Sequence, residues 1–102
     1  MKNYVILSKD GQEIRTGILL HPGDILKEEL AERGLKKNFF AEKLGIHASQ
    51  LSDLLSRKKN VTAALALKLE ETLGVKADFW MRVQTAYDLE IARLEVKQKM
   101  AA

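Results

Sequence analysis

A run of short polar side chains between residues 47 and 53 could hydrogen-bond to the edges of DNA bases. The polar members of this run are His47, Ser49, Gln50, Ser52 and Asp53. Leu51, Leu54 and Leu55 recur among them at the spacing of one buried helix face. A helix that buries these leucines presents the polar side chains outward, where they could reach base edges in the major groove. The pattern therefore indicates recognition of DNA rather than catalysis.

A shorter helix precedes this one and is separated from it by a tight turn. Phe40, Ala41 and Leu44 lie three or four residues apart, which again predicts one buried face. Gly45 ends that period, because glycine reaches a left-handed backbone without steric cost. The small side chain of Ala41 would let the two helices cross closely. Residues 36–57 therefore predict a helix-turn-helix unit, with one helix across the DNA backbone and the second in the major groove.

Positive charge is concentrated around this unit. The whole chain has a formal net charge of only +3, which is weak evidence by itself. Residues 36–60 carry six Lys or Arg against two acidic residues, whereas residues 21–35 carry two against four. The basic excess sits at the ends of the predicted unit, where DNA phosphates would pass. An ordinary solvated surface is the alternative, and only the accompanying motif favours the phosphate interpretation.

Composition excludes several other classes of protein. The 102 residues suffice for one small domain, and the absence of cysteine leaves no disulfide, thiolate or Cys-based zinc site. No apolar run approaches the ~18 residues of a membrane span, so we expect a soluble, cytoplasmic protein. His21 and His47 fall at different helix ends, and no Gly-rich phosphate loop or metal-ligand spacing is found. We therefore expect no enzyme, no metal site and no cofactor.

The chain before the helix-turn-helix unit divides into two parts. Residues 1–20 are β-like, with a β-prone run at residues 4–7, alternation around residues 14–18 and an Asp-Gly turn signal at residues 10–11. This segment is predicted to be either an ordered hairpin or an arm that orders only on binding. A helical domain, residues 21–102, follows it. Its first helix begins at Pro22, where His21 would serve as a cap or a surface residue.

Two further helices are predicted after the unit. The first is capped by Thr62 and closed by Gly74. The last starts near residue 77 and extends to about residue 99, with an apolar seam that outlasts a small five-helix core. An uncovered apolar seam marks a partner surface more often than a solvated face. Homodimerisation is the first expectation, and the predicted dimer or partner surface comprises Tyr87, Ile91 and Leu94.

Taken together, these residues resemble the Cro/repressor (Xre) helix-turn-helix family and, within it, the HigA (VapI) antitoxins. The resemblance spans about residues 20–90 and rests on three stretches: HPGDIL at 21–26, AEKLGI at 41–46 with LSDLL at 51–55, and LGV at 73–75 leading to FW at 79–80 and YDL at 87–89. It implies an all-α, five-helix, lambda-repressor-like domain that acts as a homodimeric repressor on double-stranded operator DNA. It also implies a partner, a HigB-type toxin that cleaves mRNA, and autoregulation of the shared operon.

The resemblance also implies roles for individual residues. The base-reading positions would be His47, Ala48, Ser49, Gln50 and Asp53. The phosphate contacts would be Lys36, Lys37, Ser52, Arg57, Lys58 and Lys59. Gln50 could pair bidentately with adenine, whereas Asp53 would repel phosphate and should face a cytosine amino group or a basic neighbour. The toxin could be held by the N-terminal strands, through β-augmentation, or by the C-terminal helix, and we favour the strands.

Four places depart from the family pattern. Lys36-Lys37 replaces Ser or Thr followed by Gln, His47 replaces a better helix cap, and Arg57 replaces a glycine. Phe39 replaces a polar residue, so its ring is expected either to be exposed or to meet the N-terminal segment. Two alternatives therefore stay open beside the antitoxin. One is a stand-alone regulator of the same family without a toxin. The other is a protein-interaction module that has lost operator binding.

Overall fold

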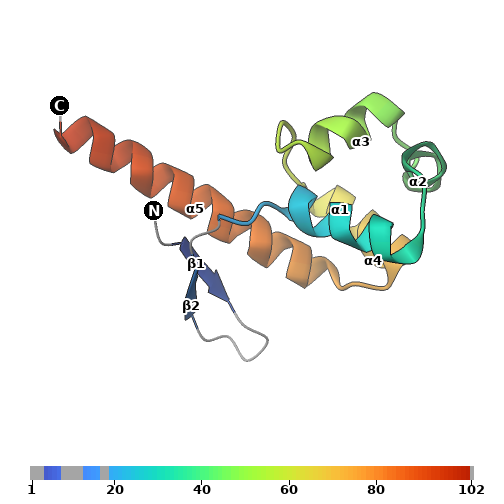
Figure 1. Ribbon diagram of the computed structural model, residues 1–102, viewed down its shortest axis with the longest axis horizontal. Coiled ribbons are helices and arrows are strands. Elements are labelled where there is room, and N and C mark those ends of the chain that lie inside the picture. Colours follow the sequence, from blue (N-terminus) through green and yellow to red (C-terminus); the bar gives the residue numbers. More distant parts are fainter. Residues whose placement is uncertain (1–3, 8–12, 17–18, 102) are drawn as a thin grey trace.

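The computed structural model describes residues 4–7, 13–16 and 19–101, and it places four short helices around the first half of a long one (Figure 1). The helices are α1 (Pro22–Arg33), α2 (Lys37–Leu44), α3 (Ala48–Leu55), α4 (Ala63–Leu73) and α5 (Ala77–Ala101). The predicted all-α, five-helix domain with an extended C-terminal helix is therefore confirmed. α2 and α3 form the helix-turn-helix pair, and Gly45 between them has the left-handed φ of 71° that the sequence led us to expect.

A single leucine-rich core holds the helices together. Its fully buried members come from four different helices and are Leu26, Leu51, Leu54, Ala66, Leu69 and Trp80, each 0% exposed. Leu51 and Leu54 lie at positions that the three- and four-residue spacing predicted, so the binary pattern determined which face of α3 is buried. Trp80 is the largest of them, and its Nε1–H has no hydrogen-bond partner among the described residues. Its contribution is therefore packing alone, reduced by the cost of a buried unpaired donor.

Side-chain hydrogen bonds, two of them local and one between distant parts of the chain, fix the ends of the helices. Thr62 Oγ1 accepts a hydrogen bond from the Leu65 N–H (3.2 Å), as predicted for the start of α4. At the other end of α4, an Nη2 proton of Arg33 is donated to the Leu73 carbonyl (2.9 Å). The N-terminal amide of α5, on Ala77, donates to Glu70 Oε1 (2.9 Å). These bonds satisfy backbone groups that a helix leaves unpaired at its ends.

Two short strands precede the helices. β1 (Tyr4–Leu7) and β2 (Glu13–Thr16) pair in antiparallel fashion, with Tyr4 opposite Thr16 and Leu7 opposite Glu13. The Asp-Gly turn signal at residues 10–11 lies outside the described residues. β1 lies beside α5 (Figure 1), which gives the pair the support that an isolated two-stranded sheet lacks.

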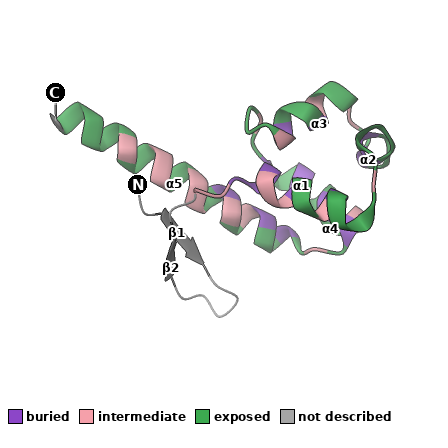
Figure 2. Cartoon of the chain, viewed as in Figure 1, coloured by how far each residue is buried: buried purple, intermediate pink, exposed green. Residues whose placement is uncertain are grey.

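The second half of α5 extends away from the other helices. Figure 2 shows that its exposed surface increases toward the C-terminus, and Val96 is 54% exposed and Met100 82% exposed. None of the helices in the described part of the chain has the length and apolar character needed to cross a membrane.

The start of α1 packs against the end of α3 at an unusually short distance. A Cβ built on Gly23 would lie 1.9 Å from the Leu54 carbonyl oxygen and 2.9 Å from its carbon, both of which are backbone atoms. Backbone cannot swing aside as the tip of a side chain can, so only glycine fits between the two helices. The sequence indicated Pro22 as the start of the helix but gave no sign of this contact.

Gly23→Ala should therefore destabilise the domain by about 1–3 kcal/mol through overpacking. Urea unfolding followed by circular dichroism would measure the destabilisation. Lys27→Ala, an exposed change on the same helix, is the matched control and should leave the free energy of unfolding nearly unchanged. An unaltered midpoint in Gly23→Ala would mean that α1 and α3 are less closely packed than described.

Candidate nucleic-acid interface

The outward face of α3 presents the short polar side chains that the sequence singled out. His47, Ala48, Ser49, Ser52 and Asp53 are all exposed. Leu51 and Leu54, on the opposite face, are 0% exposed. Because the leucines anchor the helix to the core, its polar face has a fixed orientation and is open to a partner along its whole length (Figure 2).

Gln50 differs from the other predicted base-reading residues, because its side chain folds back on its own helix. Its Oε1 accepts a hydrogen bond from the His47 N–H (2.9 Å), and the residue is partly buried. The weak cap that His47 offers at the start of α3 is thus supplemented by Gln50, as in a capping box. In this conformation only the Nε2 group of Gln50 is left for a partner, whereas a bidentate adenine contact needs both ends of the amide.

Predicted phosphate contacts lie at both ends of the helix pair. Lys36 and Lys37 are exposed at the N-terminus of α2. After α3, the backbone N–H groups of Lys58 and Lys59 both donate to the Asp53 carbonyl, at 2.8 and 3.2 Å. The second basic segment is therefore tied to the C-terminal end of α3. Lys37 lines one pocket with Ser52 and Ser56, so two basic segments that are separate in the chain both lie near the C-terminal half of α3.

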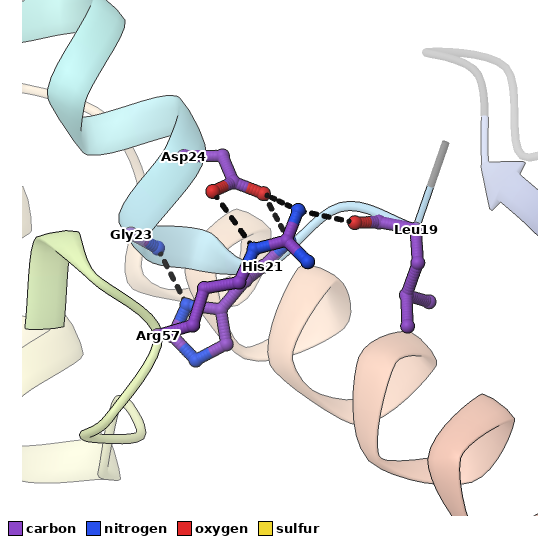
Figure 3. A network of polar contacts seen from close by, with 5 residues as sticks. All are labelled: Leu19, His21, Gly23, Asp24 and Arg57. Carbon is purple, nitrogen blue, oxygen red and sulfur yellow. Dashed lines mark hydrogen bonds and ion pairs between the residues drawn. The ribbon is translucent and has the colours of Figure 1, made fainter. Parts of the chain in front are cut away.

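Arg57, predicted as a phosphate contact, has its guanidinium turned toward the start of α1 (Figure 3). Its Nη2 and Nε donate to the two carboxylate oxygens of Asp24, at 2.7 and 3.1 Å, and Nη2 also donates to the Leu19 carbonyl (2.9 Å). Burial alone would raise the pKa of Asp24, but the hydrogen bonds and charge of Arg57 and the His21 N–H hold that pKa below its ordinary value. The pair was not predicted from the sequence.

The backbone conformation of Arg57 is one that residues other than glycine rarely adopt. It is the single non-glycine residue with positive φ among the described residues, at φ 69°. The family resemblance placed a glycine here, and the structure shows the same left-handed turn made by arginine. The strain of that conformation is offset by the contacts of the guanidinium with Asp24 and Leu19.

His21 caps α1 but is not a surface residue, since its side chain is 0% exposed. Nδ1 accepts a hydrogen bond from the Gly23 N–H (2.9 Å), while the His21 N–H donates to Asp24 Oδ2 (3.0 Å). Nε2 faces Asn60 Oδ1 at 3.5 Å, and the ring lies edge-on to Tyr87, with centroids 4.8 Å apart. Burial lowers the pKa of His21 below its ordinary value, and Nδ1 must stay unprotonated to accept the bond from Gly23.

The predicted partner surface on α5 is partly covered by the protein itself. Tyr87, Ile91 and Leu94 are each partly buried, and Tyr87 packs on His21. Nearby, Gln84 is only 3% exposed and its Oε1 accepts from the Val61 N–H (2.7 Å). Its Nε2 donates to Asp88 Oδ1 (2.9 Å). Sequence reasoning missed Gln84, because a polar residue on a helix gives no sign of a partner more than twenty positions away.

Phe39 is exposed, which was one of the two outcomes that the sequence left open. Its side chain is 51% exposed, and the Lys43 ammonium lies 5.3 Å from the ring centroid, within cation–π range. Among the described residues, no group of three or more His, Cys, Asp or Glu side chains is arranged to hold a metal ion.

Comparisons with known proteins agree with this geometry. Residues 26–80 match the family model described as helix-turn-helix, a span that includes α2, α3 and α4. Virulence-associated protein I of Dichelobacter nodosus is 38% identical over 74 residues, which cover 72% of this chain and 68% of that protein.

Two solved structures share the fold over most of their length. One is the Pseudomonas aeruginosa antitoxin HigA with the higBA promoter, with a TM-score of 0.75 and 27% identity, covering 81% of this chain and 91% of that one. The other is the antitoxin GraA in complex with its operator, with a TM-score of 0.72 and 31% identity, covering 86% of this chain and 91% of that one.

The buried, neutral ring of His21 predicts a loss of stability in mild acid. Below the ordinary pKa of 6.5 the unfolded chain binds a proton that the folded state resists, so the free energy of unfolding should fall as the pH drops from about 7 to 5. Asp24, whose pKa is lowered from 3.8, ceases to contribute only at lower pH. Urea titrations at several pH values would measure both effects. In His21→Asn the free energy of unfolding should change little between pH 7 and 5. In the control His47→Asn, which replaces an exposed histidine, it should still fall over that range.

The dual role of Arg57 predicts different effects for two substitutions that remove the same guanidinium. Arg57→Ala abolishes the ion pair and keeps the strained backbone, whereas Arg57→Gly abolishes the ion pair and relieves the strain. Arg57→Gly should therefore be about 1 kcal/mol more stable than Arg57→Ala in chemical denaturation. Asp24→Asn should also cost less in the Arg57→Gly background than alone, because its partner has already gone. Strict additivity would show that Asp24 and Arg57 are not coupled in solution.

Proposed function

The chain belongs to the helix-turn-helix family of DNA-binding proteins, and from this premise we propose that it is a sequence-specific transcriptional repressor of the antitoxin type. The observation that carries the proposal is the exposed polar face of α3, which is anchored by buried leucines and accompanied by lysines at the start of α2 and directly after α3. Relatives with the same fold are named as an antitoxin with its promoter and an antitoxin in complex with its operator.

In the proposed complex, α3 enters the major groove of double-stranded operator DNA. The base-reading residues are His47, Ala48, Ser49, Gln50 and Asp53. Gln50 would offer Nε2 to a base acceptor while Oε1 continues to cap the helix, or it would release the cap to make a bidentate contact with adenine. Ser52 and the four lysines Lys36, Lys37, Lys58 and Lys59 would contact phosphates and so set the position of α3 on the duplex.

Arg57 enters this proposal in a different way from the lysines. Its guanidinium is engaged with Asp24 and with the Leu19 carbonyl, so its contribution to DNA binding is to shape the loop that carries Lys58 and Lys59. A direct phosphate contact would require the ion pair with Asp24 to open. The lysines, whose ammonium groups form no such pair with the residues that the structure describes, are the better phosphate ligands.

The proposed protein partner is a HigB-type toxin, since the relatives that share the fold are named as HigA and GraA antitoxins. The two N-terminal strands are the favoured toxin-binding element, because a two-stranded sheet offers open edges to a third strand. The seam of Tyr87, Ile91 and Leu94 lies on α5, the helix that β1 contacts, and would extend the same surface. A stand-alone regulator is the alternative, and a neighbouring gene for a small basic protein would favour the antitoxin.

Binding to the DNA upstream of the protein's own gene, compared with random DNA across a salt series, tests the proposal. We expect tight, sequence-preferring binding with a palindromic footprint. Replacing Lys36, Lys37 or Lys58 by Ala should weaken binding and reduce the slope of log affinity against log salt by about 0.9 for each phosphate that is no longer neutralised. Lys97→Ala and Lys99→Ala, on the exposed end of α5, are matched controls that should leave the slope unchanged. Salt-sensitive binding without sequence preference would contradict the repressor and leave only a basic surface.

A further inference from the structure

The loop between α3 and α4, residues 56–62, is fixed beyond its two lysines by a side chain of α5. Val61, two residues after Lys59, is 3% exposed, and its N–H donates to Gln84 Oε1 at 2.7 Å. Gln84 is itself 3% exposed. Because a buried N–H without a partner is costly, this hydrogen bond favours the one loop conformation in which the Val61 amide meets Gln84.

The side-chain amide of Gln84 has a single orientation here. Its Oε1 can only accept and takes the hydrogen bond from Val61, while its Nε2 can only donate and is 2.9 Å from Asp88 Oδ1. The carboxylate of Asp88 accepts hydrogen bonds and has no proton to give, so a reversed amide would lose both bonds. Asp88, one turn further along the same helix, therefore directs the acceptor end of Gln84 toward the loop.

This contact with α5 is distinct from the one through which Arg57 shapes the same loop. Arg57 precedes the two lysines and is paired with Asp24 at the start of α1. Val61 follows the lysines and is bonded to α5. Lys58 and Lys59 thus lie on a segment whose two ends are tied to different helices, and the position of the segment beside α3 depends on both ties.

We propose that Gln84 is a positioning residue for DNA binding, which holds the loop where Lys58 and Lys59 reach phosphates. Because Gln84 is buried, it acts through the loop and not by contact with DNA. The inference rests on the proposed function in taking phosphates as what the lysines bind. A residue that served the core alone would change the stability of the protein and leave the DNA affinity of the folded protein unaltered, so the two roles are separable.

Operator binding of Gln84→Met over a salt series measures the effect on the lysines. Methionine is similar in length to glutamine, but its thioether is a weak acceptor, so the Val61 N–H loses its partner. We expect weaker binding and a slope of log affinity against log salt that falls by about 0.9 for each lysine that no longer meets a phosphate. Gln98→Met, the same change at an exposed position of α5, is the matched control and should leave the slope unchanged.

Two lysine backgrounds show whether the effect acts through this loop. In Lys58→Ala with Lys59→Ala, Gln84→Met should have little further effect on the slope, because the contacts that it governs have already gone. In Lys36→Ala with Lys37→Ala, on the other basic segment, Gln84→Met should have its full effect. An equal effect in the two backgrounds would overturn the proposal.

A double variant restores the hydrogen bonds by exchanging their groups. Gln84→Glu with Asp88→Asn keeps an oxygen facing the Val61 N–H, a bond between the two side chains and the net charge. It should bind with the wild-type slope, even though burying the carboxylate lowers the stability of the protein. A slope that follows the stability of the variants, and not the acceptor at position 84, would contradict the proposal. Gln84→Asn, whose shorter amide does not reach Val61, replaces Gln84→Met if the latter fails to fold by circular dichroism.

Amide hydrogen exchange without DNA tests the positioning separately from the proposed function. The Lys58 and Lys59 amides are bonded to the Asp53 carbonyl, and the Val61 amide is bonded to Gln84. In Gln84→Met these three amides should exchange faster by a larger factor than the amides of α1, because the loop opens locally. An equal factor throughout would assign Gln84 to the core alone and overturn the proposal. If the wild type binds no DNA, the repressor fails, and this comparison alone decides the positioning.

Discussion

Polar contacts at the start of α1 join this helix to other parts of the molecule and fix its position. The buried ring of His21 accepts a hydrogen bond from Gly23 and lies against Tyr87 of α5, while Asp24 binds both the His21 N–H and the guanidinium of Arg57. Leucine packing brings these helices together but does not by itself specify their relative orientation. A network in which every buried polar group has a partner does specify it, because any other arrangement leaves one of them unsatisfied.

This junction has consequences for the interface that the helix-turn-helix pair presents. The chain leaves α3 through Arg57, whose left-handed backbone turns it back over the start of α1, and the amides of the next two lysines are tied to the Asp53 carbonyl. The planar fork of arginine suits the bidentate pair with Asp24, whereas lysine carries a point charge on a flexible stem. The arginine thus shapes the loop, and in the proposed DNA complex the lysines contact the phosphates.

Local signals made most of the fold predictable. Three- and four-residue spacing identified the buried leucines, and Pro22, Thr62 and the glycines marked where helices begin and end, because these effects depend only on near neighbours in the chain. The polar pairs that orient the helices could not be found in this way. Arg57 meets Asp24, and Gln84 meets Val61, across long stretches of sequence and without any periodicity. The folded-back conformation of Gln50 was also hidden, since the same side chain is suited to capping and to reading a base.

α5 carries two apolar surfaces, and the apolar pattern of its sequence does not distinguish them. Its seam turns toward the protein, with Trp80 fully buried and Tyr87 and Ile91 partly buried, and this is the face that the apolar period revealed. The face with Met81 and Leu89, in the groove between α4 and α5, is interrupted by charges and so gives a weaker apolar signal.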